Sequence, residues 1–172
     1  GRRRLKELYF LKNAGSAAIF VLTGFVYPLA VAPAIVSTGS LAALIAFFVP
    51  FEITYEIAYD LRDVEGDRAA SPPIATYPVA HGPEAAVRII HALLAIASLT
   101  LAGALGLGAV GVREGLMLAA PAVQLTTLRS RTDPSSEDCT RLTWIGAGLL
   151  VFYLAGTAAW STAGLPENIF LR

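Results

Sequence analysis

The stretch Leu41–Asp67, LAALIAFFVPFEITYEIAYDLRDVEGD, begins as a run of apolar residues and ends in closely spaced acids. Five of its carboxylates are spaced 4, 4, 3 and 4 residues apart: Glu52, Glu56, Asp60, Asp63 and Asp67. On a continuous helix, at about 100° per residue, they share an arc of roughly 80°, whereas Glu65 points to the other side. The stretch therefore predicts an apolar helix with one stripe of acids toward its carboxyl end.

The chemistry of this stripe follows from the closeness of the acids. Several anions this near to one another cannot all stay ionised in a low-dielectric site, so they must take up protons or bind cations. Oxygen-only ligand sets favour Mg²⁺ or Ca²⁺, and Mg²⁺ held by a few carboxylates usually shares its coordination shell with the phosphates of a substrate. The stripe therefore indicates diphosphate chemistry at a membrane face. The alternative is a solvated helix end for Asp60, Asp63 and Asp67, and a protonated or hydrogen-bonded acid for Glu52.

The rest of the chain has the composition of a membrane protein. Of its 172 residues, 55% are hydrophobic and only 15% are charged, and the mean hydropathy is +0.61. Soluble domains carry about 25% charged residues. Apolar runs of bilayer length predict five spans, at roughly Ala14–Val36, Leu41–Tyr59, Ile89–Val110, Gly115–Leu128 and Thr143–Ala163. The fold class is therefore all-α, a polytopic bundle of transmembrane helices, in which Pro121 and Gln124 interrupt the fourth span.

The net charge is zero, but the basic residues are placed asymmetrically. With five spans threaded in order, eleven of the thirteen Lys and Arg residues fall on the N-terminal side, and only Arg113 and Arg172 fall on the other. Basic residues stay on the cytoplasmic side of a membrane. We therefore expect an inner-membrane protein whose acidic stripe faces the cytoplasm, with membrane lipid around it and no nucleic acid as a partner.

Few other side chains suggest chemistry. Cys139 is the single cysteine, so there is no disulfide framework. His81 and His91 lie ten residues apart, whereas a zinc pair would want a shorter spacing and a third ligand. The span after the basic N-terminal residues is too long for the apolar region of a signal peptide, so we expect these residues to act as a cytoplasmic anchor.

A family pattern is carried by Tyr59–Asp67, YDLRDVEGD, followed by Arg68, by Thr76–Val79, TYPV, and by Gly82. It resembles the second aspartate-rich motif of the UbiA superfamily of intramembrane prenyltransferases, D-x-x-D-x-E-G-D-R followed by T-L-P-V and a Gly. Upstream, Leu11–Asn13, LKN, resembles the entry into the middle helices of this family. The resemblance covers about residues 4–82 by motif, and the rest of the chain by its hydropathy pattern.

The resemblance also draws attention to a missing motif. Members of this superfamily have about nine helices and two acidic motifs, the first of the N-D-x-x-D type. This chain has five predicted spans and one such motif, and no Asn-Asp pair occurs in it. Residues 1–172 thus resemble the C-terminal half of such an enzyme, with the N-terminal half missing from the sequence or supplied by another polypeptide. A degenerate relative is the remaining alternative. In each case we expect the isolated chain to be inactive.

The activity that the resemblance implies is transfer of an isoprenyl group from an allylic isoprenyl diphosphate to a lipophilic or aromatic acceptor, with Mg²⁺ as cofactor. It makes Asp60, Asp63 and Asp67 the catalytic, metal-binding residues, with Glu56 supporting the metal from the preceding turn.

Residues beside the acids are candidates for substrate binding. Lys12, Asn13 and Arg68 can contact the diphosphate; cytoplasmic anchoring and helix capping are the alternative roles. An aromatic face on the same helix can stabilise a carbocation and pack an isoprenoid tail, with lipid contact as the alternative. This face consists of Phe48, Phe51, Tyr55 and Tyr59.

Other functions fit the sequence less well. Between the acidic motif and TYPV, Ser71–Ala75 stands where the family usually carries a Gly and a basic residue, so no phosphate contact is assigned to this loop. A membrane CDP-alcohol phosphotransferase needs a D-G-x-x-A-R motif, which the chain lacks. A cation-binding transport protein would place its acids near the middle of the bilayer. A non-catalytic membrane subunit that keeps the fold and part of the metal site is the third alternative.

Overall fold

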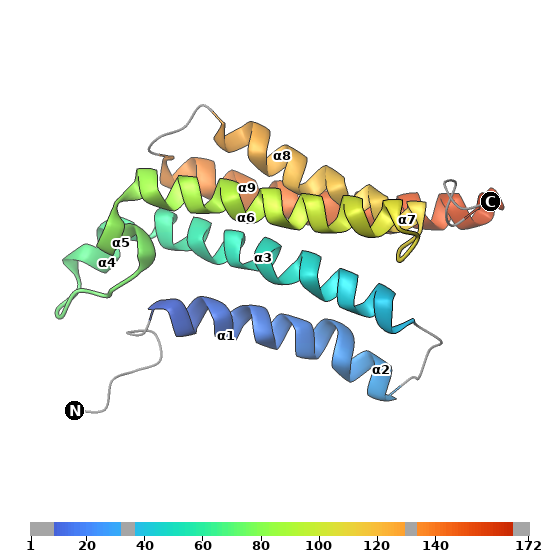
Figure 1. Cartoon of the computed structure of the whole chain (residues 1–172). Helices are drawn as coiled ribbons and strands as arrows, with labels where there is room; N and C mark the ends of the chain where they lie inside the picture. Colours follow the sequence, from blue (N-terminus) through green and yellow to red (C-terminus); the bar gives the residue numbers. More distant parts are fainter. Residues whose placement is uncertain (1–8, 32–36, 130–133, 167–172) are drawn as a thin grey trace.

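The computed structural model of the chain describes residues 9–31, 37–129 and 134–166. Figure 1 shows long helices packed side by side, with α3 between α1 and the group formed by α6, α8 and α9. The elements are α1 (Tyr9–Val21), the π-helical turn η2 (Leu22–Val26), α2 (Tyr27–Val31), α3 (Thr38–Arg62), α4 (Val64–Ala69), α5 (Tyr77–His81), α6 (Pro83–Gly106), α7 (Val112–Gly115), the 3-10 turn η3 (Leu116–Leu118), α8 (Ala119–Leu128) and α9 (Ser136–Thr162). Every regular element within the described ranges is helical, which confirms the predicted fold class.

Four helical stretches of the described residues are long and apolar enough to cross a membrane. They are Leu11–Val31, Thr38–Arg62, Pro83–Gly106 and Ser136–Thr162. Each corresponds to one of the predicted spans, although residues 32–36, at the end of the first predicted span, lie outside the described residues. The chain is therefore a multi-pass membrane protein with a helical bundle.

The predicted fourth span, Gly115–Leu128, is not one of these long helices. The structure divides this region among α7, η3 and α8, and α8 alone has 10 residues, or about 15 Å of helix. Figure 1 nevertheless shows α7 and α8 running back along α6, so that the chain returns before α9 begins. α9 therefore begins at the same end of the bundle as α6, as the charge argument requires, although the described residues between them form no long helix.

Serine caps explain where two of the long helices begin. Ser37 Oγ accepts a hydrogen bond from the Ser40 backbone N–H at 3.0 Å, and Ser135 Oγ accepts one from the Asp138 backbone N–H at 3.1 Å. Asp138 Oδ2 in turn accepts from the Ser135 backbone N–H at 3.0 Å, which completes a capping box. These caps start α3 and α9 ahead of the apolar runs that predicted them.

The core of the bundle lies between α3 and α6. Ala97 and Leu101 of α6 are fully buried and cluster with Phe47 of α3, while Ile90 of α6 clusters with Ile57 of α3. In each long helix, an 18-residue apolar window can be compared for burial. The buried share of this window is 28% in α3 and in α6, but only 6% in Leu11–Val31 and in α9. α3 and α6 are therefore the inner helices, and most of the surface of α1 and α9 faces outward.

One end of the bundle collects most of the charge. α1 begins, α3 ends and α6 and α9 begin at this end, which we call the Asp60 end (Figure 1). Its described basic residues are Lys12, Arg62, Arg68, Arg88, Arg129 and Arg141. Arg113 of α7 lies at the opposite end, which we call the Arg113 end, whereas Arg2, Arg3, Arg4, Lys6, Arg131 and Arg172 lie outside the described residues. The asymmetry that predicts the orientation is thus present in the structure, and the orientation itself stays a prediction.

Candidate functional site

The acids are presented by the end of α3 and by α4. α3 ends at Arg62, and Asp63 leaves the helical conformation with φ −98° and ψ 5° before α4 begins at Val64. The Asp63 backbone N–H still donates to Tyr59 O at 3.1 Å, and the Asp67 N–H donates to Asp63 O at 2.9 Å. The single continuous helix predicted for the stripe is therefore interrupted at Asp63. The backbone hydrogen bond from Asp67 to Asp63 nevertheless keeps these two residues one helical turn apart.

Asp60 is the most deeply buried of the acids. It is 2% exposed, and its carboxylate accepts a hydrogen bond from Lys12 Nζ through Oδ1 and one from Asn13 Nδ2, at 3.5 Å, through Oδ2. Lys12 and Asn13 belong to α1, so this contact joins two helices far apart in the sequence. The structure thus brings together three residues that the sequence singled out.

Glu56 and Asp63 have partners of their own. Ser16 Oγ of α1 donates to Glu56 Oε1 at 2.8 Å. Arg62 donates to both carboxylate oxygens of Asp63, from Nε at 2.8 Å and from Nη2 at 2.9 Å. The hydrogen bond from Arg62 is the main reason why the pKa of Asp63 lies below its ordinary value. Asp63 is therefore held as an anion, and its carboxylate is engaged by a neighbour in the chain.

Asp67 lies close enough to Asp60 to sense its charge. Burial raises the pKa of the Asp67 carboxyl above its ordinary value, and the negative charge of Asp60 raises it further, while Lys12 opposes the rise. Asp60 and Asp67 therefore act on one another electrostatically, as expected of acids that share a site. Arg68, which follows Asp67, is exposed on α4 and makes no hydrogen bond or ion pair with any described residue.

The donor atoms fit a divalent cation by type. Glu56, Asp60, Asp63 and Asp67 offer only oxygen, the ligand that Mg²⁺ prefers. Asn13 Oδ1 adds a buried oxygen that has no hydrogen-bond partner among the described residues. Within those residues, however, no three His, Cys, Asp or Glu side chains form a group that could hold a metal ion. The acids are engaged instead by Lys12, Ser16 and Arg62, each through a different carboxylate.

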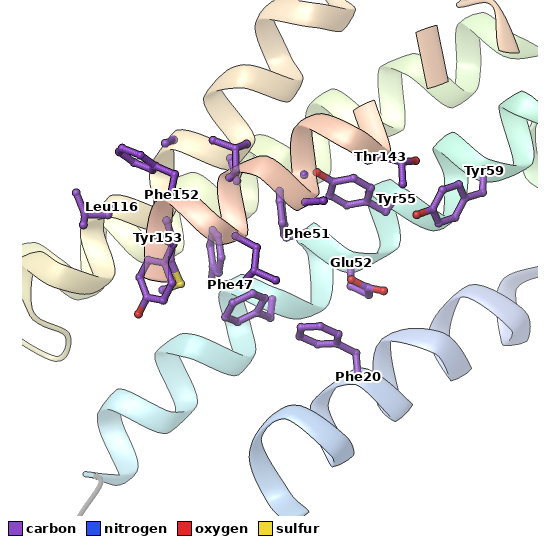
Figure 2. A pocket seen from close by; sticks show the side chains of 18 residues that line it. Phe20, Phe47, Phe51, Glu52, Tyr55, Tyr59, Leu116, Thr143, Phe152 and Tyr153 are labelled. Carbon is purple, nitrogen blue, oxygen red and sulfur yellow. The ribbon is translucent and has the colours of Figure 1, made fainter. Parts of the chain in front are cut away.

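Behind the acids lies an apolar cavity of about 370 Å³. Tyr59, the neighbour of Asp60, lines it, and the cavity extends along α3 between η3, α8 and α9 (Figure 2). The rings on α3 are in contact, with centroids 5.4 Å apart for Phe47 and Phe51 and 5.3 Å apart for Phe51 and Tyr55. All four residues of the predicted aromatic face line this cavity: Phe48, Phe51, Tyr55 and Tyr59.

The sequence did not single out Gly146 and Tyr153 of α9 or Ser16 of α1, which complete the site. Tyr153 and Gly146 of α9 line the cavity, and a Cβ on Gly146 would lie 2.6 Å from the Tyr55 hydroxyl. Gly146 therefore makes room for the Tyr55 ring. In the sequence, Gly146 belongs to an ordinary apolar run, and Ser16 to a span of small residues, so neither carries a local signal.

A comparison with known protein families gives a match over most of the chain. Residues 4–146 match the profile of the UbiA prenyltransferase family. No curated protein and no solved structure was found to match the chain. The family profile covers well over half of the sequence, from Lys12 and Asn13 through the acidic motif to the first turns of α9. The chain therefore belongs to the UbiA prenyltransferase family.

Proposed function

We propose that the chain binds an allylic isoprenyl diphosphate, with the diphosphate at the Asp60 end and the isoprenoid tail in the aromatic cavity, for transfer to a lipophilic acceptor. The contact of Lys12 with Asp60 carries this proposal, because it sets a cation and buried carboxylate oxygens next to Tyr59, which lines an apolar cavity. A substrate with an anionic head and a hydrocarbon tail matches that sequence of environments.

The head of such a substrate has several partners at the Asp60 end. Lys12 is about one third exposed, so its ammonium can contact a diphosphate oxygen while it remains near Asp60. Arg68 carries a further positive charge that no described residue engages. Asp60, Asp63 and Asp67, supported by Glu56, supply the oxygens for Mg²⁺, which when bound stabilises the charge that develops on the departing diphosphate.

The tail is received by rings. Phe51, Tyr55 and Tyr59 line the cavity next to the acids, and their faces can stabilise an allylic cation electrostatically. Their apolar area also favours transfer of the isoprenoid chain out of water, by roughly 25 cal/mol for each Å² buried. We therefore assign Tyr55 and Tyr59 to substrate binding.

This proposal is tested by binding in the presence and absence of metal. The purified protein in detergent is titrated with farnesyl thiolodiphosphate, a diphosphate analogue that resists ionisation, with Mg²⁺ and again with excess chelator. We expect the chelator, and separately Asp60→Asn, to weaken binding at least tenfold. Glu137→Gln, an exposed acid of α9 outside the site, is the matched control and should change nothing. The proposal would be overturned if the affinity were the same with Mg²⁺, with chelator, and in the Asp60→Asn and Glu137→Gln proteins.

Turnover is a separate matter. The sequence holds one acidic motif, and one set of metal ligands neutralises only part of the charge on a leaving diphosphate. We therefore propose that residues 1–172 bind the diphosphate but transfer its prenyl group very slowly, and that a second motif completes the site. Rapid Mg²⁺-dependent consumption of farnesyl or geranylgeranyl diphosphate by residues 1–172 alone would contradict this.

A further inference from the structure

Glu52 is the feature of the cavity that the binding of a prenyl diphosphate does not explain. Figure 2 draws the eighteen residues that line the cavity, and among these described residues Glu52 is the one carboxylate, with no Lys or Arg beside it. Its side chain leaves α3 on the side that faces Phe20 of α1. It is half-buried and makes no hydrogen bond or ion pair with any described residue.

A hydrocarbon tail cannot provide what this carboxylate lacks. Polar groups that leave water without a hydrogen-bond partner are costly, and charged groups more so. An isoprenoid chain has no donor to offer, so filling the cavity with the tail alone would leave Glu52 unpaired. Glu56, one turn closer to Asp60, differs in this respect because Ser16 already donates to it. A ligand that brings a hydrogen-bond donor of its own would supply the partner that Glu52 lacks among the described residues.

The distance along α3 distinguishes this ligand from the diphosphate. Glu52 precedes Asp60 by eight residues, which corresponds to about 12 Å along the helix axis. A group bound at Glu52 is therefore well inside the cavity, away from the head of the prenyl substrate. The cavity lining next to Glu52 in the sequence includes the rings of Phe48 and Phe51, which favour a flat apolar body.

We propose that Glu52 is a specificity-determining residue for the prenyl acceptor: it accepts a hydrogen bond from a hydroxyl or N–H group of a neutral, ring-containing acceptor and disfavours acceptors with a carboxylate at that position. This rests on the function proposed above and names the acceptor class for the same cavity. A carboxylate of the acceptor in that position would lie beside the Glu52 carboxyl group in an apolar setting, with no lining cation to offset its charge.

Three probes with the same naphthalene frame separate the possibilities. 1-Naphthol offers a donor, 1-naphthoate carries an anion, and 1,4-naphthoquinone offers only acceptors. Binding of each is measured by equilibrium dialysis against the purified protein in nanodiscs. We expect naphthol to bind at least tenfold more tightly than either of the others. We expect Glu52→Gln to reduce its advantage over naphthoate about tenfold, and Glu52→Leu to weaken naphthol itself.

Controls keep this result separate from that of the proposed function. Glu137→Gln removes one exposed acid and should leave all three affinities unchanged. Mg²⁺-dependent binding of farnesyl thiolodiphosphate to the unmutated protein is measured in parallel. If that binding is absent from the unmutated protein, the proposed function fails. If it is present, but naphthoate or the quinone binds as well as naphthol, or Glu52→Gln leaves the preference unchanged, this inference alone is overturned.

Discussion

Replacing Gly146 with alanine tests whether Tyr55 occupies the position that gives the cavity its shape. A Cβ at residue 146 would lie 2.6 Å from the Tyr55 hydroxyl oxygen and 3.2 Å and 3.3 Å from two ring carbons. The first distance is too short to persist, so the Tyr55 ring, which lines the cavity, or the α9 backbone at residue 146 must shift. We therefore expect Gly146→Ala to weaken naphthol binding as well as to alter stability.

Two effects of opposite sign set the magnitude. Overpacking of a well-filled site costs about 1–3 kcal/mol, whereas alanine favours the helix over glycine by about 0.8–1 kcal/mol. The net result is a loss of about 0–2 kcal/mol in the free energy of unfolding. In a Tyr55→Phe background the atom at 2.6 Å is gone and the remaining contacts need shifts of a few tenths of an ångström. There Gly146→Ala should be neutral or stabilising by up to about 1 kcal/mol.

Thermal unfolding in detergent measures these changes, with the four proteins compared as a double-mutant cycle. Gly148→Ala is the matched control, because a Cβ there meets nothing within 4 Å and only the gain in helix propensity should remain. If Gly146→Ala is equally harmful with tyrosine and with phenylalanine at residue 55, the contact between α3 and α9 is not as described.

Three further predictions concern charges. Lys12→Met should lower the free energy of unfolding by about 2–4 kcal/mol, because it leaves Asp60 buried without its cation. Adding Asp60→Asn should restore most of this loss. If thermal unfolding shows that the losses from the two single mutations simply add, the pairing of Lys12 with Asp60 is refuted. Asp67→Asn should raise the unfolding temperature at pH 7 in chelator. The pKa of Asp67 is higher in the folded protein than its ordinary value in an unfolded chain. At pH values above that ordinary pKa, ionisation of Asp67 therefore lowers the free energy of unfolding. The gain should vanish as the pH falls below about 4, and a gain that persists there would contradict this origin. For topology, cysteines replacing Glu137 and Ser161, at opposite ends of α9, should react with an impermeant maleimide from the cytoplasmic and the outer side, respectively; the reverse pattern would overturn the predicted orientation.

The sequence was sufficient for the features that depend on composition and on local spacing. Apolar runs located α3, α6 and α9, and the family motif singled out Lys12 and Asn13 together with Asp60, which the structure places in contact. These signals are local or carried by a family pattern, so they do not require knowledge of how the helices pack.

Other features depend on packing and could not be anticipated. The stripe was predicted on one continuous helix, but α3 ends before Asp63 and Arg62 turns to that carboxylate. Gln124 counted against a fourth span, yet it is buried and accepts a hydrogen bond from Thr54 at 3.2 Å. The partnership of Gly146 with Tyr55 depends on the crossing of α3 and α9, and neither residue reveals it alone.

The central claim is that the head of a prenyl diphosphate lies at Asp60 while its tail lies among the rings of α3. A farnesyl diphosphate analogue with a benzophenone at the tail end can be irradiated on the protein with Mg²⁺ present, and the crosslinked residues identified by mass spectrometry. The account predicts crosslinks within residues 47–59 of α3 and 143–153 of α9, both of which line the cavity. It also predicts that Asp60→Asn removes these crosslinks. Crosslinks confined to outward residues such as Ile19 and Leu154, or unchanged by Asp60→Asn, would contradict the account.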